Sequence, residues 1–196
     1  MELDIFKRRR PKLIGEDKIF RSAVCIPLIE KCGSFEILFE VRSSSIPDQP
    51  GDICLPGGAI EKGETPQKAA LRELCEEILV REDQFEVIGP SDIFHTESLI
   101  TYTYVGILKD YSGTHNEEAA EVFTVPLDFF LKSKPEIYPV HYDVVPGEDF
   151  PYERINGGKN YNWRGRNTCQ LFYQYENRCI WGLTAKLIHA FIQIIK

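Results

Sequence analysis

Three glutamates fall within five residues of a segment that reads A-L-R-E-L-C-E-E-I-L-V at 70–80. In a helix, Glu73, Glu76 and Glu77 stand at i, i+3 and i+4, so they share one face and repel by about 0.2–0.5 kcal/mol per pair. Clustered carboxylates hold hard divalent cations, and Mg²⁺ takes oxygen ligands while keeping sites for water and phosphate. A bound ion would relieve the repulsion. The alternative is a solvated acidic helix face.

The residues around this cluster predict how it is positioned. Thr65 is a suitable N-cap and Pro66 suits the first helical position, so we expect a helix from about 66 to about 79. The interleaved leucines and isoleucine of this helix would face the core and hold the acidic face in place. Before the helix, residues 42–58 are rich in Ser, Pro, Gly and Asp, which is typical of a loop.

The rest of the chain is expected to contain several apolar strands and a second long helix. Strands are expected at 19–28, 35–41, 85–88, 99–108, 122–125 and 168–175, and an amphipathic helix at 183–195. K-C-G-S at 31–34 is a plausible hairpin turn, and a short helix follows Pro126. This mixture favours one α+β or α/β domain over 1–196, with an N-terminal arm at 1–18 and an irregular insertion at 133–167.

The composition bears on which partners and which redox environment to expect. The formal net charge of −7 argues against broad binding to a nucleic-acid backbone, so no nucleic-acid partner is expected. The six cysteines are scattered without a C-x-x-C pair, which favours a reducing cytoplasm over a disulfide framework. No apolar run approaches the roughly 20 residues of a membrane span, so no membrane partner is expected. A homodimer is left open.

The glycine-rich loop and the acidic helix together resemble the Nudix hydrolase motif. That motif is Gly, five residues, Glu, seven residues, then Arg-Glu-aliphatic-any-Glu-Glu-any-Gly-aliphatic. The matching residues are Gly58, Glu64, Arg72, Glu73, Leu74, Glu76, Glu77 and Val80. Only Leu79 departs, because it stands where the family has Gly. The resemblance implies the Nudix fold, an α/β/α sandwich with a mixed β-sheet between helices and a catalytic loop-helix-loop.

The resemblance also implies an enzyme that cleaves a nucleoside diphosphate linked to another group, with Mg²⁺ or Mn²⁺ as cofactor. In that case Glu73, Glu76 and Glu77 would be metal ligands, and Arg72 would orient Glu73 through a charge-assisted pair. Glu64 would reach the metal through water, and the carbonyl of Gly58 would complete the shell. A bound ion would neutralise phosphate oxygens and lower the pKa of the attacking water.

A general base is still needed. The acidic loop before the strand at 122–125 offers Glu117, Glu118 and Glu121, and Glu97 is a further candidate. Related enzymes often use a glutamate outside the motif for this role, and we favour Glu118. The alternative for Glu118 is an exposed loop acid without a catalytic role.

The preceding segment resembles a second pattern, carried by the coenzyme A pyrophosphatase branch of the family. That pattern is Leu-Leu-Thr-any-Arg-Ser/Ala, three residues, Arg, three, Gly, three, Phe-Pro-Gly-Gly. The matching residues are Leu38, Arg42, Ser43, Gly51, Pro56, Gly57 and Gly58, and the departures are Phe39, Glu40, Pro47 and Leu55. The resemblance implies hydrolysis of coenzyme A or its thioesters to 3′,5′-ADP and 4′-phosphopantetheine products, with Arg42 on a phosphate.

Several alternatives to this interpretation stay open. Pro47 and Leu55 replace the branch's Arg and Phe, which keeps an ADP-ribose, dinucleotide or nucleoside-triphosphate hydrolase in view. A catalytically quiet nucleotide sensor is disfavoured because the acidic set is intact. The aromatic and basic segment at 150–166 is either a lid that stacks on a base or a packed surface loop. The basic stretch at 7–12 either contacts phosphate or is a solvated arm.

The missing glycine at Leu79 carries a structural prediction of its own. A glycine there would turn left-handed at the end of the helix, whereas a residue with a Cβ held left-handed costs about 1–2 kcal/mol. The sequence therefore predicts that the helix continues past Leu79 toward Glu82.

Overall fold

A computed structural model describes residues 3–196 of the chain. The larger of its two sheets has eight strands. They are β1 (Phe20–Lys31), β2 (Ser34–Arg42), β3 (Ile53–Cys54), β4 (Gly57–Ala59), β5 (Phe85–Pro90), β6 (Phe94–His95), β7 (Leu99–Leu108) and β8 (Ala119–Pro126). β1 and β7 run parallel, whereas every other pair is antiparallel, so the sheet is mixed as expected.

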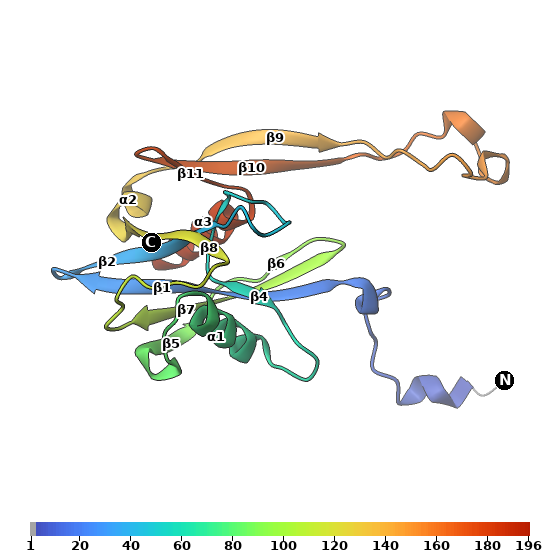
Figure 1. Cartoon of the computed structure of the whole chain (residues 1–196). Coiled ribbons are helices and arrows are strands. Elements are labelled where there is room, and N and C mark those ends of the chain that lie inside the picture. The colour runs from blue at the N-terminus through green and yellow to red at the C-terminus, as the bar shows by residue number, and fades with distance from the viewer. Residues whose placement is uncertain (1–2) are drawn as a thin grey trace.

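Two apolar clusters place helices on both faces of this sheet (Figure 1). α1 (Pro66–Glu77) packs Leu74 against Leu38 of β2 on one face. α3 (Gly182–Ile195) and the short α2 (Leu127–Lys132) cover the other face, and Ile188 and Phe130 lie in the second cluster. The expected α/β/α arrangement is therefore confirmed.

A second, three-stranded sheet lies over α3 and was not expected. It consists of β9 (Glu136–Tyr142), β10 (Arg166–Tyr175) and β11 (Arg178–Trp181) in the order β11-β10-β9. Leu171, Tyr173 and Ile180 of this sheet join the same core cluster as α3. The sheet therefore adds a further layer to the sandwich, and the only expected part of it was the strand at 168–175.

The prediction that 133–167 is an irregular insertion is wrong near both ends of the segment, where β9 and the first residues of β10 are strands, whereas 143–165 contains only two short 3-10 turns. β9 pairs with β10 from Glu136↔Phe172 to Tyr142↔Arg166, forming a long hairpin. This hairpin and the N-terminal arm project from the same side of the body (Figure 1). The period of alternation in E-I-Y-P-V-H-Y is obscured because β9 is mostly exposed on both faces and carries a proline.

The loop expected at 42–58 contains two short strands. β1 pairs with β2 at Leu28–Lys31, but nearer its start it pairs with β4 at Ser22–Val24, so β3 and β4 fill the opening between β1 and β2. Gly57 of β4 has φ 150°, and a Cβ there would lie 2.4 Å from the backbone oxygen of Ala23. This close approach requires glycine.

Local signals at two turns are confirmed. Lys31 pairs with Ser34, and Cys32 and Gly33 between them have φ 50° and 79°, as a two-residue hairpin turn requires. At the start of α1, the Thr65 hydroxyl accepts a hydrogen bond from the backbone N–H of Lys68 at 3.3 Å. Both features depend on neighbouring residues only, which explains why the sequence predicts them.

The prediction that the helix continues past Leu79 is wrong. α1 ends at Glu77, Ile78 is its C-cap, and Leu79 adopts the left-handed conformation with φ 52°. Leu79 therefore takes the conformation of the family's glycine although it has a Cβ. Ile78 is fully buried beside α1, so its anchoring in the core directs the chain into the turn at the expense of local strain.

We expect Leu79→Gly to raise the free energy of unfolding by up to about 1 kcal/mol. Glycine removes the left-handed strain, and the gain is reduced by the larger conformational entropy of glycine in the unfolded chain. Little burial is lost because the Leu79 side chain is 56% exposed. Urea unfolding would measure the change. Leu79→Ala, which keeps the Cβ, should not gain, and equal stability of the two variants would contradict the strain argument.

Candidate active site on helix α1

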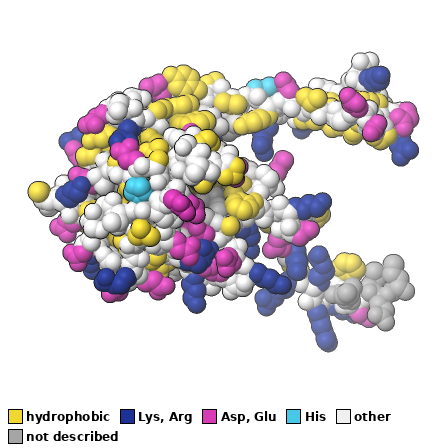
Figure 2. Space-filling model, in the orientation of Figure 1, with side chains coloured by type: hydrophobic (Ala, Val, Ile, Leu, Met, Phe, Trp, Pro, Cys, Tyr) yellow, Lys and Arg dark blue, Asp and Glu magenta, His cyan; other side chains and the backbone are white. Residues whose placement is uncertain are grey.

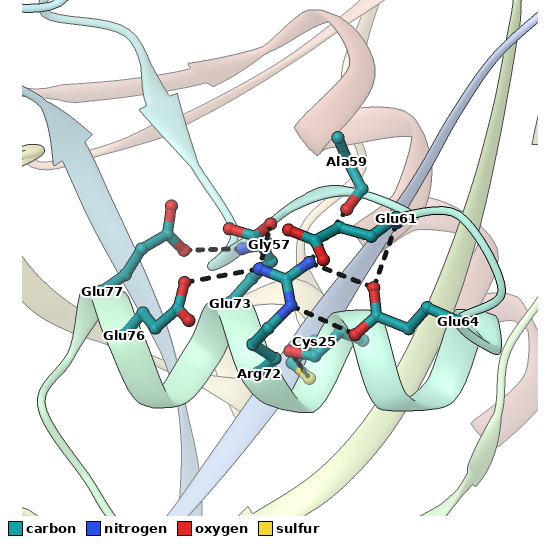
Figure 3. A network of polar contacts seen from close by, with 10 residues as sticks. Cys25, Gly57, Ala59, Glu61, Glu64, Arg72, Glu73, Glu76 and Glu77 are labelled. Carbon is teal, nitrogen blue, oxygen red and sulfur yellow. Dashed lines mark hydrogen bonds and ion pairs between the residues drawn. The ribbon is translucent and has the colours of Figure 1, made fainter.

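Arg72 joins the acidic residues of the motif into one network (Figure 3). Its guanidinium donates from Nε and Nη2 to the two oxygens of Glu64, both at 3.1 Å. Nη1 donates to Glu73 at 2.8 Å and to Glu76 at 3.3 Å, and Nη2 also reaches the Ala59 carbonyl at 3.1 Å. The bidentate geometry to Glu64 is one that a lysine cannot reproduce.

These contacts shift the pKa values of Arg72 and Glu64 away from their usual values. Hydrogen bonds to Glu64 raise the pKa of Arg72 further above its already high value. The hydrogen bond from Arg72 lowers the pKa of Glu64, which is therefore held as a carboxylate. The predicted pairing of Arg72 with Glu73 is present in the structure, and Glu64 is the stronger partner.

Glu77 lies at the end of α1 and points into the protein. It is only 8% exposed, and its Oε2 accepts a hydrogen bond from the backbone N–H of Gly57 at 2.7 Å. Burial raises the pKa of this carboxyl strongly, and repulsion from the Glu40 charge adds to the effect. A carboxylate in this position is destabilised in the absence of a cation.

Glu73 lies against the glycine loop. A Cβ on Gly58 would come within 2.6 Å of its Oε2 and 2.7 Å of its Oε1, so glycine leaves the space that the carboxylate fills. Burial raises the pKa of Glu73, and the Arg72 hydrogen bond opposes that change. Gly58 and Glu73 therefore pack closely together, and any larger residue at position 58 would displace the Glu73 carboxylate.

A cavity of ≈ 1080 Å³ opens beside these carboxylates. Glu73, Glu77 and Glu118 line it together with Gly57 and Gly58, and Arg42, Arg166 and Lys186 line it as well. Glu64, Arg72 and Glu76 are not among the lining residues. Figure 2 shows acidic side chains gathered in the middle of the body's visible face, close to Lys and Arg side chains. The cavity therefore combines carboxylates with cationic groups that suit phosphate.

The four candidate general bases differ in whether they line the cavity and in whether a cationic side chain already holds them. Glu121 is held by Arg178 at 2.6 and 3.0 Å and does not line the cavity, and neither does Glu117. Glu97 lines it and lies 3.7 Å from Arg166. Glu118 lines it beside Glu73 and Glu77, and its loop is tethered because the Glu118 carbonyl accepts from the Ser43 N–H at 2.8 Å. This arrangement favours Glu118.

Glu40 lies outside the Nudix motif, and the sequence motifs assign it no role. It is 3% exposed in β2, and burial raises its pKa, with repulsion from Glu118 adding to the increase. In the sequence, Glu40 stands out because it replaces the threonine of the branch pattern. The alternation of acidic and apolar residues in F-E-I-L-F-E-V is typical of a half-exposed strand, whereas the structure buries Glu40.

The aromatic side chains of the predicted lid do not line the cavity. Tyr152 and Trp163 pack on Phe150 with ring centroids 5.0 and 5.4 Å apart, and Tyr161 packs on Trp163 at 4.9 Å. They form a small aromatic cluster at the tip of the β9–β10 hairpin. From this segment only Arg166, the first residue of β10, lines the cavity. A lid function of the hairpin stays a prediction.

The donor set fits a divalent cation. Its members are carboxylate and backbone oxygens, which hard cations prefer, and Glu77 and Glu40 are buried without a cationic side chain bonded to them in the described chain. Among residues 3–196, no three Asp, Glu, His or Cys side chains are already arranged to hold an ion. Binding one therefore requires side-chain rotation, since Arg72 holds Glu73 and Glu76.

We expect Arg72→Ala to lower divalent-cation affinity and hydrolytic activity by about 10–100-fold, as for other residues that orient metal ligands. Without the guanidinium, Glu64, Glu73 and Glu76 lose their common partner and repel one another. Mn²⁺ titration calorimetry would measure the affinity. Arg81→Ala is the matched control, because within residues 3–196 the Arg81 guanidinium pairs with the exposed Asp83 and with no residue of the site. Equal losses in the two variants would argue against a positioning role for Arg72.

The chain is similar in sequence to known proteins. The NUDIX domain model matches residues 19–146. The chain is 34% identical over 153 residues to a mouse protein named peroxisomal coenzyme A diphosphatase NUDT7, covering 73% of this chain and 64% of that protein. It is 25% identical over 204 residues to Nudix hydrolase 3 of Caenorhabditis elegans, covering 95% of this chain and 78% of that protein. The chain thus spans just under two thirds of the mouse relative.

The fold is also similar to a solved structure, a MutT/nudix family protein from Enterococcus faecalis. The TM-score is 0.55 at 15% sequence identity, and the match covers 100% of this chain and 70% of that one. In the part of the chain that the structure describes, no helix is long and apolar enough to cross a membrane. The domain model, the relatives and the geometry of α1 lead to one conclusion: the chain belongs to the Nudix family.

Proposed function

We propose that this chain hydrolyses the diphosphate of coenzyme A or its thioesters, releasing 3′,5′-ADP and 4′-phosphopantetheine products, with Mg²⁺ or Mn²⁺. The observation that carries the proposal is the position of Arg42, the first of the two arginines in the branch pattern and the one that this chain keeps. It lines the same cavity as Glu73 and Glu77 of the motif. The name of the mouse relative, a coenzyme A diphosphatase, supports the same substrate.

The shape and charge of the cavity suit this substrate. Coenzyme A carries a central diphosphate and a separate 3′-phosphate, so it needs cationic groups at more than one point. Arg42 lies beside the carboxylates, with its Nε held by the Asp48 carbonyl at 2.9 Å. Arg166 and Lys186 line the cavity from β10 and α3. A dispersed set of this kind favours a ligand with several phosphates.

Each residue of the site would then have its own role in the reaction. Glu73, Glu76 and Glu77 would hold the ion, with Glu64 and the Gly58 carbonyl in support. When bound, the ion supplies charge neutralisation at the phosphate oxygens and a more acidic water. Arg72 would orient the carboxylates, and Glu118, which lines the cavity, would accept the proton of the attacking water. Arg42 positions the diphosphate for in-line attack.

A substrate panel tests the proposal. The protein is incubated with Mg²⁺ and coenzyme A, ADP-ribose, NADH or dNTPs, and products are separated by chromatography. We expect kcat/KM for coenzyme A to exceed the others by at least about tenfold, a difference of about 1.4 kcal/mol in transition-state binding. Higher turnover of ADP-ribose, which Pro47 and Leu55 keep in view, would overturn the substrate. Saturable binding without turnover would point to a sensor.

A further inference from the structure

Glu40 of β2 is a buried carboxylate without a hydrogen-bonding role. It is 3% exposed, and no described residue provides a hydrogen-bond partner for its Oε1. Arg42 lies two residues farther along the strand, but no ion pair joins the two among residues 3–196. A buried carboxylate in this state is destabilising unless a proton or a cation neutralises it. Its position therefore suggests a ligand.

The strand directs Glu40 toward the end of α1. Side chains alternate between the two faces of a strand, so Glu40 faces the same side as Leu38. Leu38 packs with Leu74 and Ile78 beneath α1. Because α1 ends at Glu77, Glu40 lies under the part of the helix from which the last glutamate of the motif projects.

The pairing of β2 with β3 also places Glu40 near Glu77. Glu40 lies opposite Cys54 in the β2–β3 pair, and three residues later the N–H of Gly57 donates to Glu77 Oε2 at 2.7 Å. The carboxylates of Glu40 and Glu77 therefore flank one short segment. Glu118 approaches from the other edge of β2, since its neighbour Ala119 pairs with Arg42. Three chain segments thus bring the carboxylates of Glu40, Glu77 and Glu118 near enough to repel one another, and an oxygen of Glu40 has no described partner.

We propose that Glu40 is a further, direct carboxylate ligand of the divalent cation, from outside the Nudix motif. The inference rests on the proposed function only in assuming that an ion binds beside Glu77. It distinguishes this chain from the branch pattern, in which a threonine stands at this position. An ion in contact with Glu40 and Glu77 satisfies the unpartnered oxygen and relieves the repulsion between the two groups.

The test measures Mn²⁺ binding rather than catalysis. Wild-type protein, Glu40→Gln and the smaller Glu40→Thr are titrated with Mn²⁺, and the free ion is followed by electron paramagnetic resonance. We expect both variants to bind Mn²⁺ at least about tenfold more weakly. Glu36→Gln is the matched control: Glu36 lies on the same strand, but Lys31 already neutralises it at 2.6 Å. Circular dichroism checks that each variant is folded.

Unchanged Mn²⁺ affinity in both Glu40 variants would overturn the proposal and leave Glu40 as a protonated partner of Glu77. If the variants fail to fold, a crystal structure of the wild type soaked in Mn²⁺ decides by anomalous scattering. Glu40 Oε1 is expected at about 2 Å from the ion, as a direct oxygen ligand requires. An ion bound to Glu77 but far from Glu40 would contradict the inference.

The outcomes separate this inference from the proposed function. If Glu77→Gln and Glu40→Gln both weaken Mn²⁺ binding but coenzyme A is not hydrolysed, the cation site stands and the substrate proposal fails. If Glu77→Gln weakens binding and Glu40→Gln does not, only the role of Glu40 is lost. If coenzyme A is hydrolysed and neither variant changes Mn²⁺ affinity, the ion binds elsewhere.

Discussion

Glu77→Gln is expected to lower hydrolysis of the best substrate on the order of 10³-fold, which corresponds to about 4 kcal/mol of transition-state stabilisation. The amide cannot supply a charged oxygen to a divalent cation, so charge neutralisation at the diphosphate is lost. The fold should persist, because the amide oxygen of glutamine still accepts the hydrogen bond from the Gly57 N–H. Steady-state kinetics over a range of Mg²⁺ concentrations would measure the loss.

A matched substitution controls for nonspecific effects. Glu82 lies in η3 (Glu82–Gln84), just beyond α1, and is exposed, so Glu82→Gln should leave kcat/KM and stability unchanged. Nearly full activity of Glu77→Gln at saturating Mg²⁺ would contradict the assignment of Glu77 as a ligand. Loss of activity together with loss of the fold would point instead to a structural role at the buried end of α1.

The second large effect is a fall in the stability of the metal-free protein as pH rises from about 5 to about 9. The pKa values of Glu77 and Glu40 are both raised above 4.5 by burial. Above that pH the unfolded chain releases protons that the folded protein retains, so ionisation favours unfolding until the folded carboxyls also titrate. Each unit of raised pKa corresponds to about 1.4 kcal/mol, so we expect a loss of several kcal/mol.

Urea unfolding in the presence of a chelator at about pH 5, 7 and 9 would measure this dependence. The carboxylates with lowered pKa values, such as Glu36 and Glu121, act in the opposite sense, but only as pH falls below about 5. Glu77→Gln should flatten the profile and be more stable than wild type at about pH 9. Stability that rises steadily with pH in both proteins would refute the electrostatic argument.

Much of the site follows from short-range signals in the sequence. The Thr65 cap and Pro66 define where α1 begins, and the spacing of Glu73, Glu76 and Glu77 places them on it. The contact of Arg72 with Glu73 joins neighbours in the chain, so it is present as expected. These features depend on helix geometry, which a sequence specifies within a few residues.

The end of α1 was predicted incorrectly because a local preference competed with packing. The penalty for a left-handed leucine favours a longer helix. Burial of Ile78 in the core beside Leu74 outweighs that penalty, so Leu79 turns left-handed and remains exposed. Hydrophobic burial of a whole isoleucine side chain is worth about 1.5–3 kcal/mol, which exceeds the strain.

The motif residues predict the acidic face of α1 and, through the family resemblance, the sandwich of helices around a mixed sheet. The projecting β9–β10 hairpin and the burial of Glu40 near Glu77 become visible only in three dimensions. They could not be predicted because the residues that meet there lie far apart along the chain. Glu40 and Glu77 are brought together by the packing of α1 on β2, and no local pattern encodes a contact that depends on how two elements meet.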